Sequence, residues 1–199
     1  MKNLWDERYS SLEYVYGKEP NGFFSSELGE RTPGRLLLPG EGEGRNAVHA
    51  AISGWEVHAF DQSAAARKKA FTLASEAGVN LTYELNSLEE FPFLADTYDA
   101  VALIYFHAPP AQRQYLHLKA LESLKPGGHI ILEGFHKEQL GRNTGGPGSL
   151  EMLFDEDMLR ADFSGMENLR LEKHLINLNE GPFHQGEASV IRFTGTKQK

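Results

Sequence analysis

The stretch from position 35 to position 51 decides the fold and reads Arg35-Leu-Leu-Leu-Pro-Gly-Glu-Gly-Glu-Gly-Arg-Asn-Ala-Val-His-Ala-Ala51. Its apolar run Leu36–Leu38 predicts a buried parallel strand. Asn46–Ile52 predicts the first turns of an alanine-rich helix, which Gly54 ends. Glycines this dense between a strand and a helix are typical of a backbone that comes close to a ligand at a helix N-terminus. The stretch therefore predicts a nucleotide-type binding site.

An acidic residue strengthens this interpretation. A second short strand, Glu56–Phe60, is followed by Asp61, seventeen residues after Gly44. A carboxylate at that strand end is where the two hydroxyls of an adenosine ribose would be bound. We therefore expect an adenosine-containing cofactor. An ordinary turn at the glycines and a helix-capping role for Asp61 are the simpler alternatives.

The loop departs from two common nucleotide fingerprints. A dinucleotide loop Gly-x-Gly-x-x-Gly needs its third glycine at position 45, where this chain has Arg45. No Gly-x-x-x-x-Gly-Lys-Ser/Thr loop occurs in the sequence, which argues against a phosphate-cradling NTPase. S-adenosylmethionine remains. It carries no phosphate, so the loop need only pass close to its amino acid end while a carboxylate holds the ribose.

Composition favours one globular domain and argues against a long nucleic acid as its partner. A chain of 199 residues suits a single well-buried domain. Its formal net charge of -8 disfavours a long nucleic acid as partner, because phosphate neutralisation needs clustered base. The absence of cysteine excludes disulfides, cysteine nucleophiles and thiolate metal sites. With no apolar signal core and no bilayer-spanning stretch of about 20 apolar residues, we expect a cytoplasmic protein without a membrane partner.

Strands and helices alternate along most of the chain. Beyond the second strand, the pattern predicts helices at 63–77 and 109–123 and strands at 81–85, 98–105 and 129–135, the last preceded by a tight turn at 125–128. This alternation predicts an α/β fold with a Rossmann-like, doubly wound, mostly parallel sheet. The strand-like runs 169–178 and 187–194 have no helix between them. We therefore expect a seven-stranded sheet that ends in an antiparallel hairpin.

Three segments carry a family resemblance. Gly40–Ala47, Asp61 and Leu124–Glu133 resemble the cofactor loop, the ribose-binding acid and the start of the fifth strand of class I S-adenosylmethionine-dependent methyltransferases. The sequence is most similar to the small bacterial branch related to the tellurite-resistance and thiopurine methyltransferases. In that branch an N-terminal aromatic segment precedes the fold, and Trp5–Tyr9 and Tyr14–Phe23 are similar to it.

The resemblance covers essentially the whole chain. It implies one methyltransferase domain over residues 1–199, in which residues 1–30 form an aromatic cover or lid and residues 31–199 form the catalytic fold. The sequence departs from the family at one position. Relatives carry an acidic residue two positions before the first loop glycine, and this chain has Leu38 there. Glu41 or Glu43 is the candidate substitute at the amino end of the cofactor. Asn86 stands where relatives commonly have Asp.

Candidate cofactor-binding residues lie in the glycine loop and at three strand ends, and they are Gly40, Glu41, Gly42, Asn46, Asp61, Gln62, Asn86, Ser87, Leu88 and Tyr105. The aromatic face of Tyr105 could stabilise a sulfonium by cation–π attraction, with core packing as the alternative. For Asn86–Leu88, the alternative is a plain turn.

Two histidines are candidate catalytic residues. His107 and His136 follow the fourth and fifth strands, at the carboxyl edge where parallel sheets bind ligands. A titratable ring there could take a proton from an incoming thiol, hydroxyl or amine. A structural or capping histidine is the alternative. His184 is a third, but the three lie on different loops without a His-x-x-x-His pair, so we expect no metal site.

Candidate substrate-binding or lid residues are Trp5, Tyr16, Asn21, Phe24 and Arg142. The N-terminal aromatic side chains form either a hydrophobic cover for the sheet edge or a lid that excludes water and orients the reactants. Arg142 lies in the loop Gly141–Gly148, which is a second lid candidate or a flexible linker. In a lid, Arg142 would meet an anionic acceptor.

These observations lead us to expect S-adenosylmethionine-dependent transfer of a methyl group to a small-molecule acceptor, by a monomer or homodimer. The sulfonium is an activated donor, so most catalysis should come from holding acceptor and methyl group in line. Two alternatives remain open, an NAD-dependent oxidoreductase and a non-catalytic S-adenosylmethionine-binding module.

Overall fold

The structure, a computed structural model, describes residues 2–199, and it describes the side chains of residues 4–199. The described chain divides into two compact units. The first contains residues up to Pro92 together with Glu180–Phe183, and the second contains Phe93–Asn179 and His184–Lys199. Across residues 2–199, seven strands form the mixed, mostly parallel α/β sheet with a terminal antiparallel hairpin that the sequence predicts.

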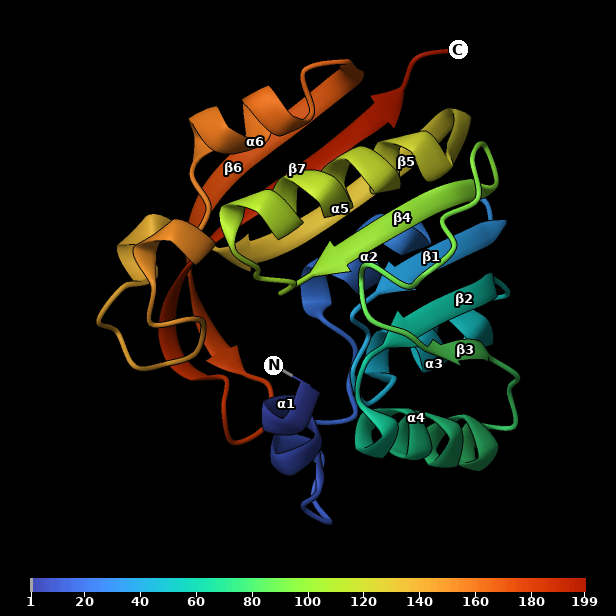
Figure 1. Cartoon of the computed structure of the whole chain (residues 1–199), viewed down its shortest axis with the longest axis vertical. Coiled ribbons are helices and arrows are strands. Elements are labelled where there is room, and N and C mark those ends of the chain that lie inside the picture. The colour runs from blue at the N-terminus through green and yellow to red at the C-terminus, as the bar shows by residue number, and fades with distance from the viewer. Residues whose placement is uncertain (1) are drawn as a thin grey trace. The chain divides into compact units, whose positions relative to one another are not determined.

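Three parallel strands form the sheet of the first unit. They are β1 (Arg35–Pro39), β2 (Glu56–Asp61) and β3 (Thr82–Leu85), in the spatial order β3-β2-β1. The helices α3 (Arg45–Ile52) and α4 (Ala64–Ala77) connect them and are drawn beside them in Figure 1. Because the three strands are parallel, the carboxyl ends of β1, β2 and β3 lie along one edge.

The ends of α4 follow the expected local chemistry. The Ser63 hydroxyl accepts a hydrogen bond from the Ala66 backbone N–H and caps the N-terminus, and Gly78 ends the helix in the left-handed conformation. The N-terminal aromatic segment contains two short helices that the sequence analysis did not predict, α1 (Lys2–Tyr9) and α2 (Gly22–Gly29). They contribute most of the aromatic residues proposed as a cover or lid.

The second unit holds the remaining four strands in the order β4-β5-β7-β6. The strands β4 (Tyr98–Ile104) and β5 (Leu124–Phe135) are parallel, and α5 (Pro110–Ser123) connects them and covers them in Figure 1. The long strands β6 (Met166–Asn179) and β7 (Gln185–Lys197) form the expected antiparallel hairpin. The short helix α6 and the 3-10 turns η1 and η2 lie between β5 and β6, at Glu156–Asp162, Lys137–Gln139 and Leu150–Met152.

One expected turn is instead part of a strand. The sequence predicts a tight turn at residues 125–128, but β5 begins at Leu124. Pairing with β4 passes from Tyr98–Leu124 to Ala100–His129, so the intervening residues form an irregularity within the strand. Gly127 adopts a positive φ of 82° there. The turn residues were recognised, but the pairing of Leu124 with Tyr98 extends the strand beyond them.

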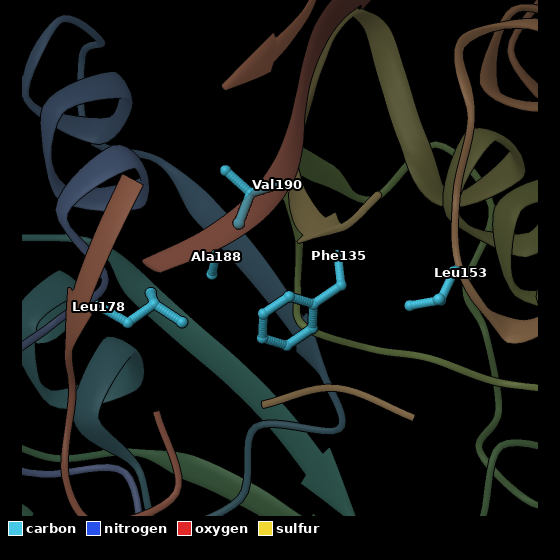
Figure 2. Close-up of a cluster of buried hydrophobic side chains, with 5 residues drawn as sticks. All are labelled: Phe135, Leu153, Leu178, Ala188 and Val190. Atoms are coloured by element: carbon cyan, nitrogen blue, oxygen red, sulfur yellow. The ribbon is translucent and has the colours of Figure 1, made fainter. Parts of the chain in front are cut away.

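A buried apolar cluster lies where β5 ends in the second unit. Figure 2 shows its five side chains around the Phe135 ring, and all are at most 3% exposed: Phe135, Leu153, Leu178, Ala188 and Val190. They come from β5, β6, β7 and the segment after η2. Tyr105, which follows β4, packs against this cluster. The apolar faces of the hairpin strands therefore support the carboxyl end of β5.

Gly44 has a packing reason to be glycine in addition to its conformation. Its φ is 90°, and a Cβ at this position would lie 2.6 Å from the Cβ of Ala70 and 2.8 Å from its Cα. The first turn of α3 and the middle of α4 therefore meet at Gly44. Gly54 has nearly the same φ, 89°, but the nearest atoms to its Cβ position, in Pro33, are 3.8 Å away.

We expect Gly44→Ala to lower the free energy of unfolding by about 1–3 kcal/mol more than Gly54→Ala does. Both variants incur the cost of a left-handed alanine, about 1–2 kcal/mol, but only Gly44→Ala also forces α3 and α4 apart. Urea denaturation of the two variants and the wild type measures the difference. Equal losses in the two variants would show that the contact with Ala70 is relaxed at little cost.

Candidate functional site

The glycine loop between β1 and α3 is held by side chains from the two neighbouring strands. Gly40, Gly42 and Gly44 all have positive φ, 61°, 67° and 90°. The Gly42 N–H donates to Oδ2 of Asp61 over 3.1 Å, and the Gly42 carbonyl accepts from the Tyr83 hydroxyl over 2.6 Å. The alternating left-handed glycines thus turn the backbone so that β2 and β3 fix its position.

Asp61 lies where the loop, the start of α4 and the end of β3 meet. In addition to its bond from Gly42, its Oδ1 accepts from the Ser63 N–H over 2.8 Å. The Asn86 N–H donates to the Asp61 carbonyl over 3.1 Å. Burial raises the pKa of Asp61 to about 6, although these backbone donors partly offset the effect. The structure therefore brings Asp61, the glycine loop and Asn86 together, as the sequence suggested.

Glu41 caps the helix that follows the loop. The residue at the N-cap of α3 is Gly44, which has no side chain, and Oε1 of Glu41 accepts from the Ala47 N–H over 2.8 Å. Burial raises the pKa of Glu41 to about 7, against the favourable hydrogen bonds from the helix N-terminus. Leu38 is buried in β1 and offers no acid. Glu41 thus places a buried carboxyl group in the loop, where the sequence analysis expected one.

The second acid of the loop has a different role. Oε2 of Glu43 accepts from the Val15 N–H over 2.7 Å, and Oε1 forms an ion pair with Nζ of Lys69 at 2.6 Å. Glu43 therefore attaches the N-terminal aromatic segment to α4. Of the two proposed substitutes for the missing acid, Glu41 is the better candidate, because the charge of Glu43 is already paired with the ammonium group of Lys69.

The remaining predicted residues after β2 and β3 are adjacent to Asp61 along the strand ends. The Asn86 amide donates to Oε2 of Glu84 over 2.8 Å, and the Ser87 N–H donates to Oε2 of Glu90 over 3.2 Å. Leu88 is buried and Gln62 is half-buried. Their roles toward a cofactor stay predictions.

Asn46 and Asn21 are hydrogen-bonded to each other, and the role of Asn46 toward a cofactor stays a prediction. Oδ1 of Asn46 accepts from the Asn21 N–H over 2.9 Å, and Oδ1 of Asn21 accepts from the Phe24 N–H to cap α2. The Asn21 amide also donates to Oε1 of Glu180 over 3.3 Å. These contacts attach the N-terminal segment to α3. Both asparagines therefore have a structural role that the sequence analysis did not identify.

The sequence analysis missed a buried ion pair between the start of α3 and the hairpin tip. Nη2 of Arg45 lies 3.0 Å from Oε2 of Glu180, and Nη1 of Arg45 donates to the Tyr16 carbonyl over 3.1 Å. We call this arrangement of Arg45, Glu180 and Tyr16 the clasp. Arg45 had been noted only as the residue in place of a third glycine. No signal in the sequence identifies Glu180, because its partner lies 135 residues earlier.

The other lid candidates separate into two groups. The Arg8 guanidinium lies over the rings of Trp5 (4.9 Å) and Phe183 (5.2 Å) and donates to the Tyr16 hydroxyl over 3.0 Å. Trp5 and Tyr16 thus belong to one aromatic cluster, and its role as a cover or lid stays a prediction. Phe24 is completely buried in α2, which agrees better with the packing alternative than with a substrate contact.

In the second unit, Tyr105 follows β4 in a conformation unusual for a non-glycine residue, with φ 52°. Its hydroxyl donates to Oε1 of Glu133 over 2.9 Å, and its N–H donates to the Glu133 carbonyl over 2.7 Å. The buried Glu133 carboxylate also accepts from Nε of Arg192. The Tyr105 ring packs at 4.7 Å from Phe135 and from His184. Residues held in sparsely populated conformations cluster at functional sites.

His107 has both ring nitrogens bound to backbone groups. Nε2 accepts from the Phe135 N–H over 3.0 Å, and Nδ1 lies 2.8 Å from the Met152 carbonyl, to which it must therefore donate. The ring stacks on Phe154, and burial lowers its pKa to about 4. No lone pair is left to accept a proton from a substrate. The structure therefore favours the structural alternative for His107 over the proposed general base.

His136 is likewise engaged. Nδ1 accepts from the Glu138 N–H over 3.1 Å and caps η1, and Nε2 lies 3.3 Å from Oε2 of Glu156. The accepting Nδ1 leaves the proton on Nε2, which donates to Glu156. This is the capping role that the sequence analysis gave as the alternative.

Arg142 is bound by the protein itself rather than left for an anionic acceptor. Nη1 of Arg142 pairs with Oε1 of Glu187 at 2.6 Å. Its loop is packed against the apolar cluster, since a Cβ at Gly145 or Gly146 would lie 2.8 Å from the Phe135 ring. The loop therefore covers Phe135, and the expectation that Arg142 meets an anion is not supported by its position.

Two further findings concern metals and membranes. Within the described residues, no three His, Asp or Glu side chains are arranged to hold a metal ion. The part of the chain that the structure describes also has no helix with the length and apolar character needed to cross a membrane.

The buried carboxyl groups predict how stability varies with pH. Because burial raises the pKa of Glu41 to about 7, the folded protein binds more protons than the unfolded chain between about pH 4.5 and 7. Its contribution is therefore present at low pH and lost as pH rises through 7. Denaturant titrations should show Glu41→Gln gaining stability relative to wild type across this range, by on the order of 3 kcal/mol. Parallel profiles for the two proteins would contradict the raised pKa.

His107 predicts the opposite slope. Its folded pKa, about 4, lies below that of an unfolded histidine, so its contribution is present above about pH 6.5 and lost as pH falls toward 4. His107→Ala should lower the free energy of unfolding at pH 7.5 by about 2–4 kcal/mol, since it opens a cavity and leaves two backbone groups unpaired. The loss should shrink at pH 5. A variant as stable as wild type at pH 7.5 would show that the ring is not structural.

Comparisons with known proteins agree with this geometry. Residues 37–128 match the family model described as a methyltransferase domain. A comparison with curated proteins found no match. Many solved structures share the fold.

One of these structures comes from work on the conversion of a disulfide bond into a thioacetal group during echinomycin biosynthesis. It has 15% sequence identity to this chain and a TM-score of 0.80. The similarity covers 100% of this chain and 92% of that chain. TehB from Haemophilus influenzae has 13% identity and a TM-score of 0.74, covering 99% of this chain and 67% of that one. Phosphoethanolamine N-methyltransferase 2 of Haemonchus contortus, in complex with S-adenosyl-L-methionine, has 16% identity and a TM-score of 0.69, covering 98% and 56%.

At these identities the structural likeness establishes the fold alone. The methyltransferase domain model matches residues 37–128, and the glycine loop and Asp61 lie within them. The chain therefore has the fold of S-adenosylmethionine-dependent methyltransferases, and a methyltransferase domain model matches the part of it that contains the glycine loop.

Proposed function

We propose that this methyltransferase modifies a small, uncharged or weakly charged molecule. The observation that carries the proposal is the aromatic group at the carboxyl ends of β4 and β5, where the half-buried rings of Tyr105 and His107 pack on the buried ring of Phe135. The charged side chains around this group are bound within the protein: Glu133 to Arg192 and Arg142 to Glu187. Such a surface suits an apolar or aromatic acceptor better than a phosphate or a nucleic acid.

In this proposal the first unit binds the cofactor. Asp61 accepts hydrogen bonds from the ribose hydroxyls, and the backbone at Gly40 and Gly42 passes the amino acid end. Asn86 and Ser87 bind the adenine. Glu41 is the acid nearest to the helix N-terminus, and the ammonium group of a bound cofactor would lower its pKa from about 7. Cofactor binding at neutral pH should then release a proton from Glu41.

The chemistry requires little from the protein beyond positioning. A lone pair of the acceptor attacks the methyl carbon, the bond from carbon to sulfur breaks, and its electron pair stays on sulfur to give S-adenosylhomocysteine. The acceptor proton goes to solvent. Because the ring nitrogens of His107 and His136 are occupied by the protein's own groups, we propose an acceptor that reacts without a side-chain base, such as a thiol that ionises near neutral pH or an amine.

The neighbours offer limited support for such acceptors. One concerns sulfur chemistry on a disulfide, and another is a phosphoethanolamine N-methyltransferase. Neither substrate is inferred for this chain. No structural observation favours the oxidoreductase, whose dinucleotide loop would need glycine at Arg45. The non-catalytic binding module is an outcome of the test below.

Calorimetry with S-adenosylmethionine and S-adenosylhomocysteine tests the cofactor assignment. Asp61→Asn should weaken binding about 10- to 100-fold, because it removes the charge that accepts the ribose hydrogen bonds. The matched control is Asp99→Asn, at a carboxylate paired with Lys125 on the second unit, which should bind as wild type does.

A panel of thiols, amines and phenols, followed by mass spectrometry for S-adenosylhomocysteine, tests the acceptor class. Turnover confined to phosphorylated or nucleic-acid acceptors would contradict the proposal. Tight cofactor binding without turnover on any acceptor would favour the non-catalytic module.

A further inference from the structure

Tyr9, the last residue of α1, is a buried phenol whose hydroxyl has no hydrogen-bond partner among the side chains of residues 4–199 or the described backbone. It is 6% exposed. Buried tyrosine hydroxyls usually find a partner. Among the described residues, the fully buried side-chain polar atom without a partner is Nε of Arg31, so the Tyr9 hydroxyl keeps some contact with solvent. The other tyrosines of the N-terminal segment have hydroxyls bonded within the protein. The Tyr16 hydroxyl accepts from Arg8, and the Tyr14 hydroxyl donates to the Lys69 carbonyl over 3.1 Å.

The ring of Tyr9 is fixed by its neighbours. It stacks on Trp5 with the ring centroids 5.6 Å apart and meets the edge of Tyr16 at 6.3 Å. Val15 and Ala66 complete the buried cluster around it. The side chain therefore cannot turn away easily to find another hydrogen-bond partner. The position of its hydroxyl is set by packing and not by a polar contact.

That position is directly above the glycine loop. The Tyr9 hydroxyl oxygen lies 2.9 Å from where a Cβ on Gly42 would be. Both backbone groups of Gly42 are already engaged, since its N–H donates to Asp61 and its carbonyl accepts from Tyr83. Burial, followed by the nearby Asp61 carboxylate, raises the pKa of Tyr9, so the phenol keeps its proton and remains a donor.

We propose that Tyr9 is a cofactor-binding residue whose hydroxyl donates a hydrogen bond to an oxygen of bound S-adenosylmethionine, beside Asp61 and over Gly42. The inference rests on the proposed roles of Asp61 and the loop. It gives the N-terminal aromatic segment a direct part in binding, in addition to covering the site. The acceptor is a carboxylate or ribose oxygen, the two kinds of oxygen that the cofactor carries.

The test is Tyr9→Phe, which keeps the ring and its packing and removes only the hydroxyl. We expect its dissociation constant for S-adenosylhomocysteine to rise about 5- to 10-fold, while its melting temperature without ligand stays equal to or above that of wild type. The matched control is Tyr14→Phe, which removes a hydroxyl already bonded within the protein. It should bind as wild type does and melt at a lower temperature.

Adenosine as a second probe separates the two kinds of oxygen, because it has the ribose but no carboxylate. If Tyr9→Phe weakens both ligands equally, the ribose is the partner, and if it weakens only S-adenosylhomocysteine, the carboxylate is. Wild-type affinity of Tyr9→Phe for both ligands would overturn the role of Tyr9 and leave the proposed function intact. A wild-type protein that binds neither S-adenosylmethionine nor S-adenosylhomocysteine would overturn both.

Discussion

The first unit depends on how the backbone of Gly42 is held. Its N–H donates a hydrogen bond to the side chain of Asp61 at the end of β2, and its carbonyl accepts one from the side chain of Tyr83 in β3. A loop with three left-handed glycines would otherwise have high conformational entropy. Because both peptide groups are bound, the loop is ordered before a ligand arrives, and the helix that follows can start at a defined place. Preorganisation of this kind lowers the cost of binding.

The sequence predicted the fold because its signals are local. Strand and helix periods, glycine positions and the cap at Ser63 each depend on a few neighbouring residues, and the same is true of Asp61 at a strand end. What the sequence did not predict has long-range causes. The position of His107 after β4 suggests a base, but the carbonyl of Met152, 45 residues later, binds one of its ring nitrogens. The turn residues after Leu124 are likewise part of β5, because Leu124 pairs with Tyr98 of β4.

The glycine-rich loop shows that one motif can satisfy several requirements at once. Its sequence suggested close approach to a ligand, yet Gly44 also makes room for Ala70 and Gly42 for Tyr9. Its two glutamates differ in the same way, since Glu41 caps α3 while Glu43 binds the N-terminal segment. The spacing of residues within the motif does not distinguish these roles. The partners that set them include residues of α1 and α4, which lie outside the motif.

The clasp has a consequence for how the protein is made. Arg45 is buried in the first unit with Glu180 as its ion-pair partner, and Glu180 lies 135 residues further along the chain. A nascent chain that already contains β1, β2 and β3 therefore still lacks the carboxylate that its buried guanidinium requires. The cofactor-side unit cannot reach its final form during synthesis until the hairpin tip has left the ribosome. Completion of the first unit is thereby timed by the synthesis of a hairpin that lies 135 residues after Arg45.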